Sequence, residues 1–277
     1  MKIKKVFAYM GSKGRFYKEI KKVFEENYRE TFIDLFAGGM EVPLNLKADF
    51  QNLEVIANVR DMRMELMLGM DSYSLFSNVV KEVYRDLEMI GSRIIYTKDK
   101  KKFNILKANF LEILNKHTLN EQIVIRLLGG VGGESRSLSS NFYSKNKLGN
   151  LKIYLESMRN IKIQTDYFNE KWEYENSFIF LDPPYLSSTK SDGKKGYNYE
   201  EYNSKDTWKE EDNIRLVEFI KRNREKNNIF MIFGSVGNHL QTILRKEFSE
   251  IEFHTMTYKK SIFGCSSVRE EWYCLIK

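Results

Sequence analysis

Short apolar runs alternate with amphipathic stretches near both ends of the chain, and this pattern predicts an α/β fold. The apolar runs indicate buried strands at residues 31–36, 53–58, 161–165, 178–181 and 229–233. Amphipathic periodicity predicts helices at residues 41–48, 208–226 and 237–248, and a closing antiparallel pair is expected at residues 251–258 and 272–276. The early order of strand, glycine turn, helix and strand is typical of nucleotide-binding folds.

The middle of the chain has a different pattern of apolar and polar residues, one that mostly predicts helices. Helices are predicted at residues 74–90, 100–115 and 120–128. A glycine- and serine-rich run from Gly129 to Asn141 follows, and such a run is too flexible for a core element. The sequence therefore predicts one α/β domain, residues 1–60 and 156–277, interrupted by a mostly helical domain, residues 61–155.

Four residues directly after the predicted strand 178–181 carry the clearest chemical signal: Asp182, Pro183, Pro184 and Tyr185. Proline lacks an N–H and fixes φ, so the carbonyls around it point outward instead of joining a sheet ladder. A carboxylate, a rigid carbonyl and an aromatic ring together suit the amino edge and the face of a planar base. Taken alone, the tetrapeptide is equally compatible with an ordinary turn.

The glycine- and serine-rich run and the residues after it offer hydrogen-bond donors. Glycines allow the backbone to approach a ligand closely, and the side chains of Arg136, Asn141, Lys145 and Lys147 can reach phosphates or base edges. Taken alone, the run is more typical of a disordered surface loop.

Composition adds a modest polyanion signal. The 277 residues include 45 Lys and Arg against 38 Asp and Glu, giving a net charge of +7, which favours a polyanionic partner. Aromatic residues make up 14% of the chain, which suits base stacking. With only two cysteines, no disulfide framework is indicated, and a reducing, cytoplasmic setting is expected.

The sequence lacks the patterns of a metal site and of a membrane span. The three histidines are scattered, without Cys or His partners at ligand spacing, so no metal is expected. No stretch approaches the roughly 20 apolar residues that a membrane helix needs, so no membrane contact is expected.

Several motifs in this order resemble the Dam-like, D12-class DNA adenine-N6 methyltransferases of the α group. The segment from Tyr9 to Lys13 resembles the family's first cofactor-binding segment, and Asp34 to Gly39 resembles its glycine turn. The residues from Asp166 to Phe168 resemble the motif at the end of a third strand, and Asp182 to Tyr185 resembles the catalytic motif. The stretch from Lys259 to Glu271 is similar to the family's late basic motif.

The resemblance implies a Rossmann-like class I S-adenosylmethionine-dependent methyltransferase sheet with an inserted, mostly helical target-recognition domain. It also implies methyl transfer from S-adenosylmethionine to N6 of an adenine flipped out of duplex DNA. The implied catalytic residues are Asp182, Pro183, Pro184 and Tyr185. The implied cofactor contacts are Tyr9, Gly11, Lys13, Asp34, Phe36, Gly38, Gly39, Asn58, Asp166, Phe168 and Asp182. The candidate DNA contacts are Arg136, Asn141, Lys145 and Lys147.

The chain departs from the family pattern on the cofactor side. Met40 stands where many members have glycine, and its side chain either crowds the cofactor or points into the core. Asn58 stands where the family has an acidic residue on the cofactor ribose, and the lost charge predicts weaker binding by about 1–2 kcal/mol. Asp61 is a candidate substitute, and Tyr9 for tryptophan is a milder change.

Three functions are open at this point. The first is an active DNA adenine methyltransferase, with double-stranded DNA and a cognate restriction endonuclease as partners, working as a monomer or weak dimer. The second is a catalytically weak or inactive DNA-binding protein on the same fold, motivated by Met40 and Asn58. The third is an enzyme acting on RNA or on a protein amide, although protein-amide methylases usually carry asparagine in place of Asp182.

Overall fold

The computed structural model describes residues 2–4, 6, 12–84, 100–129, 147–184, 208–262 and 265–277. The chain divides into two compact units. The sheet unit comprises Lys18–Ala37, Asn52–Asn58 and Asp166–Lys277. The helical unit comprises Met1–Tyr17, Gly38–Gln51 and Val59–Thr165.

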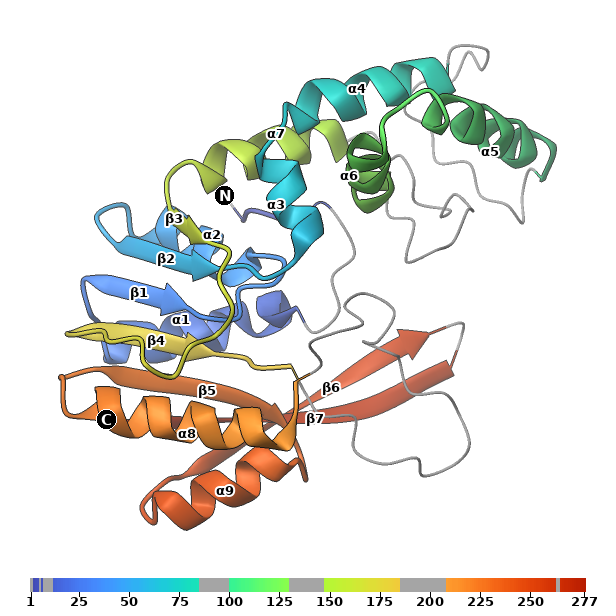
Figure 1. Ribbon diagram of the computed structural model, residues 1–277. Helices are drawn as coiled ribbons and strands as arrows, with labels where there is room; N and C mark the ends of the chain where they lie inside the picture. The colour runs from blue at the N-terminus through green and yellow to red at the C-terminus, as the bar shows by residue number, and fades with distance from the viewer. Residues whose placement is uncertain are drawn as a thin grey trace. The chain divides into compact units, whose positions relative to one another are not determined.

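A mixed sheet is the centre of the sheet unit (Figure 1). Its strands are β1 (Thr31–Asp34), β2 (Glu54–Asn58), β4 (Ser177–Leu181), β5 (Ile229–Ser235), β6 (Phe253–Ile262) and β7 (Cys265–Ile276). They lie in the order β2-β1-β4-β5-β7-β6. The first four are mutually parallel, whereas β7 runs antiparallel to both β5 and β6. The order reverses at β1, because β2 follows it on one side and β4 lies on the other.

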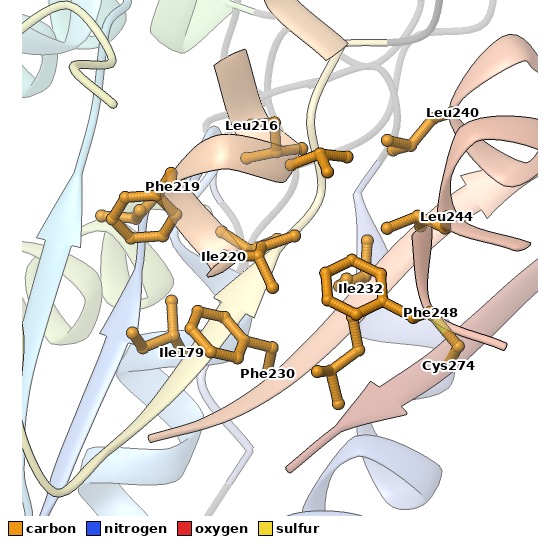
Figure 2. Close-up of a cluster of buried hydrophobic side chains, with 14 of the residues drawn as sticks. Ile179, Leu216, Phe219, Ile220, Phe230, Ile232, Leu240, Leu244, Phe248 and Cys274 are labelled. Carbon is orange, nitrogen blue, oxygen red and sulfur yellow. The ribbon is translucent and has the colours of Figure 1, made fainter. Parts of the chain in front are cut away.

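Helices cover both faces of this sheet (Figure 1). They are α8 (Glu210–Arg224) and α9 (His239–Glu247) on one face and α1 (Tyr17–Glu26) on the other. Figure 2 shows the core under α8 and α9, in which Ile179 of β4 and Phe230 and Ile232 of β5 face Ile220 of α8 and Leu244 of α9. All five side chains are 0% exposed, so this core anchors the two central strands.

The opposite face is an aromatic core under α1. The ring of Phe24 lies 5.2 Å from that of Phe178 and 5.7 Å from that of Phe32, in edge-to-face geometry. Phe32 and Phe178 stack at 5.8 Å. Because strand residues alternate in direction, these phenylalanines point away from their neighbours Ile33 and Ile179, so β1 and β4 are buried on both faces. Burial of each such ring stabilises the fold by roughly 1.5–3 kcal/mol.

The helical unit is built mainly of helices, with one short strand. Its elements are η1 (Lys13–Phe16), α2 (Glu41–Asp49), α3 (Met62–Leu68), α4 (Ser72–Val83), α5 (Lys100–Leu114), α6 (Leu119–Gly129), α7 (Lys147–Met158) and β3 (Lys162–Gln164). Helix α4 contacts α5, α6 and α7, and α2 contacts η1 and α7. The amide of Asn45 on α2 binds both backbone groups of Ile3, at 2.8 Å each.

The predicted strands and the helices before and after β5 are confirmed, with ends displaced by a few residues. The predicted helix 74–90 corresponds to α4, which begins at Ser72 and ends at Val83 with Tyr84 as its C-cap, and residues 85–90 lie outside the described residues. Helix α1 was not predicted, although its buried residues Ile20, Val23 and Phe24 have helical spacing. The closing pair is longer than predicted, since β7 pairs with β5 only from Glu271 onward and continues along β6 to Cys265.

Candidate active site at the carboxyl edge of the sheet

Three polar side chains follow one another at the carboxyl edge of the parallel strands. Asp34 ends β1, Asn58 ends β2, and Asp182 comes directly after β4. The register pairs Asp34 with Ala57 on one side and with Phe180 on the other. The residues therefore lie at one edge, on both sides of the point where the strand order reverses, which is where open α/β sheets bind ligands.

Asp34 stabilises the turn that leaves β1. Its side chain is 1% exposed, and its Oδ1 accepts a hydrogen bond from the backbone N–H of Phe36 at 3.1 Å. The backbone N–H of Leu35 donates to the Phe180 carbonyl at 3.3 Å. These two hydrogen bonds fix the turn after β1. The Phe36 side chain in this turn is half-buried.

An aromatic cluster surrounds Phe36. Its ring lies 5.7 Å from that of Phe168 and 5.3 Å from that of Trp208, and Phe168 lies 6.1 Å from Trp172. The indole N–H of Trp208 donates to Asn213 Oδ1 at 2.8 Å, which orients the ring. The structure therefore brings together two predicted cofactor contacts, Phe36 and Phe168. Trp172 and Trp208 also belong to this cluster, and the sequence analysis did not predict them as site residues.

Asn58 and Asp166 are joined by paired hydrogen bonds. The Asn58 side chain is 2% exposed, and its Oδ1 accepts from the Asp166 backbone N–H at 3.1 Å. Its Nδ2 donates to the carbonyls of Asp166 at 3.0 Å and Leu35 at 3.3 Å. Asp166 is itself exposed. Burial, and then the Asp166 carboxylate, raise the pKa of Tyr174 to about 12.

The predicted catalytic motif extends from the most deeply buried strand. Every residue of β4 is buried, and Leu181 pairs with Ile232 of β5. Pro183 is buried, whereas Asp182 and Pro184 are half-buried. The core fixes the position of the motif, and Asp182 remains partly exposed. Tyr185 lies outside the described residues.

In the helical unit, the glycine turn includes two residues with left-handed backbone geometry. Gly38 has φ 45° and Met40 has φ 53°. This region favours glycine, because a Cβ there meets the neighbouring carbonyl. Met40 is 0% exposed, so of the two predicted orientations its side chain takes the one into the protein interior. The carbonyl of Gly39 accepts a hydrogen bond from the Tyr154 hydroxyl at 3.1 Å.

The first predicted cofactor segment contacts α2 within the same unit. Lys13 is buried in η1, and Ser12 Oγ donates to Glu41 Oε2 at 2.7 Å. A Cβ placed on Gly14 would lie 1.9 Å from the Glu41 carboxyl carbon, so a larger residue there would displace the Glu41 side chain. Tyr9 and Gly11 lie outside the described residues.

One of the predicted DNA contacts is described. Lys147 begins α7, and its Nζ lies 5.5 Å from the centroid of the Phe76 ring on α4. Burial lowers the pKa of the Lys147 amine to about 8. Its amine therefore contacts an aromatic ring of its own unit. Arg136, Asn141 and Lys145 lie outside the described residues.

The sequence profile of the D12 class N6 adenine-specific DNA methyltransferases matches residues 9–262. The chain belongs to this family. Two curated relatives are similar to it. Modification methylase StsI of Streptococcus sanguinis is 26% identical over 237 residues, which cover 79% of this chain and 33% of the relative. Type II methyltransferase M.FokI of Planomicrobium okeanokoites is 24% identical over 290 aligned positions, which cover 97% of this chain and 42% of the relative.

Membership of the D12 class agrees with the observed sheet, a mixed α/β arrangement of the class I methyltransferase type. The chain spans about a third to two fifths of the length of the two relatives. Within the described ranges, no group of three or more His, Cys, Asp or Glu side chains is arranged to hold a metal ion. In the same part of this D12-class chain, no helix combines the length and apolar character of a membrane span.

For this D12-class chain, we expect Lys147→Met to increase the free energy of unfolding by about 1–2 kcal/mol at pH 7. Each unit of pKa depression corresponds to about 1.4 kcal/mol of disfavoured charge, and the contact with Phe76 offsets part of it. The folded pKa, about 8, lies below the unfolded value of 10.5. The unfolded chain therefore holds its proton to higher pH, and the wild-type protein gains stability as the pH rises through this window.

Denaturant unfolding of both proteins at several pH values measures this difference. The advantage of Lys147→Met is expected to shrink above pH 8 and to vanish near pH 10.5. Lys152→Met, on the exposed part of the same helix, is the control and should change stability little at any pH. A constant difference between wild type and Lys147→Met across the range would contradict the buried charge.

Proposed function

We propose that this chain is a site-specific DNA methyltransferase that transfers a methyl group from S-adenosylmethionine to N6 of a flipped-out adenine in duplex DNA. The observation that carries the proposal is the Asp182–Pro183 corner. It lies at the carboxyl edge of the sheet beside β1, in a chain of the D12 class. The proposed catalytic residues are those of the motif, Asp182, Pro183, Pro184 and Tyr185.

The corner suits an exocyclic amine. The lone pair of such an amine is delocalised into the ring, which makes it a weak nucleophile. The Asp182 carboxylate and the Pro183 carbonyl are both acceptors, so together they can take the two N6 hydrogens. That arrangement favours a tetrahedral nitrogen with a localised lone pair, and it orients the lone pair toward the methyl donor. Positioning and electrostatics carry most of such catalysis.

The aromatic ring of Tyr185 is proposed to stack on the flipped adenine. Base stacking on an aromatic side chain contributes roughly 1–3 kcal/mol, which offsets part of the energy lost when the base leaves the duplex. Asp182 need not deprotonate the amine in advance, because the proton can leave during or after transfer.

The sheet unit has groups that suit S-adenosylmethionine. The half-buried ring of Phe36, which meets the buried ring of Phe168, is proposed to lie against the adenine ring, and Asp34 and Asp166 are the proposed carboxylate contacts at the same edge of the sheet. When bound, the cofactor supplies an electrophilic methyl group on a sulfonium. The remaining proposed contacts are Tyr9, Gly11, Lys13, Gly38, Gly39 and Asp182.

Residues 61–155 are proposed as the target-recognition domain, inserted into a catalytic domain of residues 1–60 and 156–277. Basic side chains there would bind phosphates and set affinity, while Arg136 or Asn141 would read base edges. The relatives are named as a modification methylase and a type II methyltransferase. We therefore extend the proposal to a restriction–modification role, with a cognate endonuclease as partner and the cytoplasm as location.

Cofactor binding separates the enzyme from a DNA-binding protein on the same fold. Isothermal titration calorimetry with S-adenosylmethionine should give a dissociation constant in the micromolar range, about −8 kcal/mol. Phe168→Ala should weaken it at least about 10-fold, since it removes one wall of the aromatic cluster. DNA binding without measurable cofactor binding up to about 1 mM would reject the enzyme in favour of the binding protein.

A further inference from the structure

We propose that Asn58 is a positioning residue, which holds Asp166 and the turn after β1 in place, and that it is not itself a ligand of the cofactor ribose. The inference rests on the proposed function. All the residues involved belong to the sheet unit. The side chain is 2% exposed, and its two hydrogen-bonding groups are both used by the backbone of the protein.

The Asn58 amide binds Asp166 as a neighbouring strand would. Oδ1 accepts from the Asp166 N–H at 3.1 Å, and Nδ2 donates to the Asp166 carbonyl at 3.0 Å. The same Nδ2 donates to the Leu35 carbonyl at 3.3 Å. In addition, the backbone carbonyl of Asn58 accepts from the Ala37 N–H at 3.0 Å. One residue therefore ties the end of β2 to both the β1 turn and the Asp166 segment.

These two segments carry the groups proposed to hold the cofactor. Asp34 and Phe36 lie on the β1 turn, and Asp166 and Phe168 lie on the other segment. The rings of Phe36 and Phe168 meet at 5.7 Å. If the link through Asn58 is lost, the two segments can separate, and the aromatic cluster and the two carboxylates lose their relative positions.

The link needs an amide and excludes a carboxylate. Asparagine provides two N–H donors for the carbonyls of Leu35 and Asp166, and aspartate provides none. In aspartate, one carboxylate oxygen could keep the hydrogen bond from the Asp166 N–H, but the other would face the two carbonyl oxygens, where it is repelled and has no donor. The family's acidic residue at this place is thus incompatible with the local hydrogen bonds of this chain. Asn58→Asp, which restores the family pattern, should impair cofactor binding and not improve it.

Calorimetric titration of S-adenosylmethionine into wild type and Asn58→Asp tests the inference. At pH 8, the variant should bind about 10- to 100-fold more weakly, the range expected when buried carbonyls lose their donors. Tighter or equal binding by the variant would overturn the inference, because it would show residue 58 to be a ribose ligand. No binding by the wild type would overturn the proposed function, and the inference with it.

A pH series gives a readout that general destabilisation would not produce. The introduced carboxyl is buried and lies beside Asp166, whose backbone it contacts, and Asp34 ends the neighbouring strand, so its pKa should be raised. Tyr174, the phenol near Asp166, stays neutral, since its pKa is raised to about 12. When protonated, the introduced carboxyl regains one donor. The deficit of Asn58→Asp relative to wild type should therefore shrink as the pH falls toward 5, and a constant deficit would contradict the link.

Asn228→Asp is the matched control. Asn228 is also 2% exposed; its Oδ1 accepts from the Ser177 N–H at 2.9 Å, and its Nδ2 donates to the carbonyls of Tyr174 and Asn223. It lies where β4 and β5 begin, at the other end of the strands. The control should lose thermal stability without losing cofactor affinity. If Asn58→Asp does not fold, Asn58→Ala replaces it with the same expected direction, and unchanged affinity in that variant would overturn the inference.

Discussion

Asp182→Ala is expected to lower the rate of methyl transfer by at least about 1,000-fold, while DNA and cofactor still bind. Removing one positioned acceptor from a preorganised site typically costs 100- to 1,000-fold. Here the same group also sets the orientation of the amine, so we expect the upper end of that range or more. Asp182 is half-buried at the end of a fully buried strand, so its loss leaves the core under α1 and α8 intact.

Single-turnover rates and thermal denaturation on the same samples check this result. Asp182→Asn should also be strongly impaired, because its amide oxygen can accept one N6 hydrogen but lacks the negative charge that strengthens this bond. Glu218→Gln, an exposed carboxylate paired with Lys221 on α8, removes one negative charge and should leave the rate unchanged. Loss of folding in Asp182→Ala, or a rate within tenfold of wild type, would assign the motif a structural role.

Gly234→Ala is expected to destabilise the sheet unit by about 3 kcal/mol, at the upper end of what overpacking costs. Gly234 of β5 lies opposite Trp272 of β7 in the register. A Cβ there would lie 2.2 Å from Trp272 Cζ2. The indole is 0% exposed and its N–H donates to the Ser235 carbonyl at 2.8 Å, so the ring has no room to move away.

Denaturant unfolding of single and double variants measures this clash. Trp272→Leu alone should destabilise the protein, since it leaves a cavity. Combined with Gly234→Ala, the added methyl should fill part of that cavity, so the double variant should be more stable than the sum of the two single changes predicts. Additive effects, or a Gly234→Ala variant as stable as wild type, would contradict the tight β5–β7 packing.

The strands and the edge of the sheet could be predicted because their signals are local. An apolar run buried on both faces, such as residues 178–181, looks the same in sequence and in structure. The residues that end β1 and β4, Asp34 and Asp182, could be placed at one edge because parallel strands share a carboxyl edge. The resemblance to the family motifs then suggested which of these residues contact the cofactor and which contact the target base.

The hydrogen bonds of Asn58 could not be predicted, because their partners are backbone groups far along the chain. Residues 58 and 166 become neighbours only when the sheet forms. The motif suggested that Asn58 contacts the cofactor as a weaker acceptor than aspartate. In the structure, its Nδ2 donates to the carbonyls of Leu35 and Asp166, which aspartate could not do. The same reason hid Trp208, which joins Phe36 and Phe168 from a distant segment.

The surroundings of Lys147 and Met40 also could not be predicted, because the sequence gives only the type of each side chain and not its neighbours. Lys147 was predicted from its charge and its place after a glycine-rich run, yet its amine contacts Phe76 and its pKa is lowered. Met40 was predicted to take one of two orientations, and its burial shows that the side chain lies in the protein interior. In both cases the neighbours of the side chain in the folded protein determine its role, and the spacing of residues in the sequence does not reveal those neighbours.

Nucleoside analysis of the methylated product tests the central claim most directly. The protein is incubated with S-adenosylmethionine labelled in the methyl group and unmethylated duplex DNA of varied sequence, and the DNA is digested to nucleosides. Label in N6-methyladenine, absent when Asp182→Ala replaces the wild type, is the predicted result. Label confined to cytosine, or no label on any of the DNA, would contradict the assignment of the Asp182–Pro183 corner to adenine methylation.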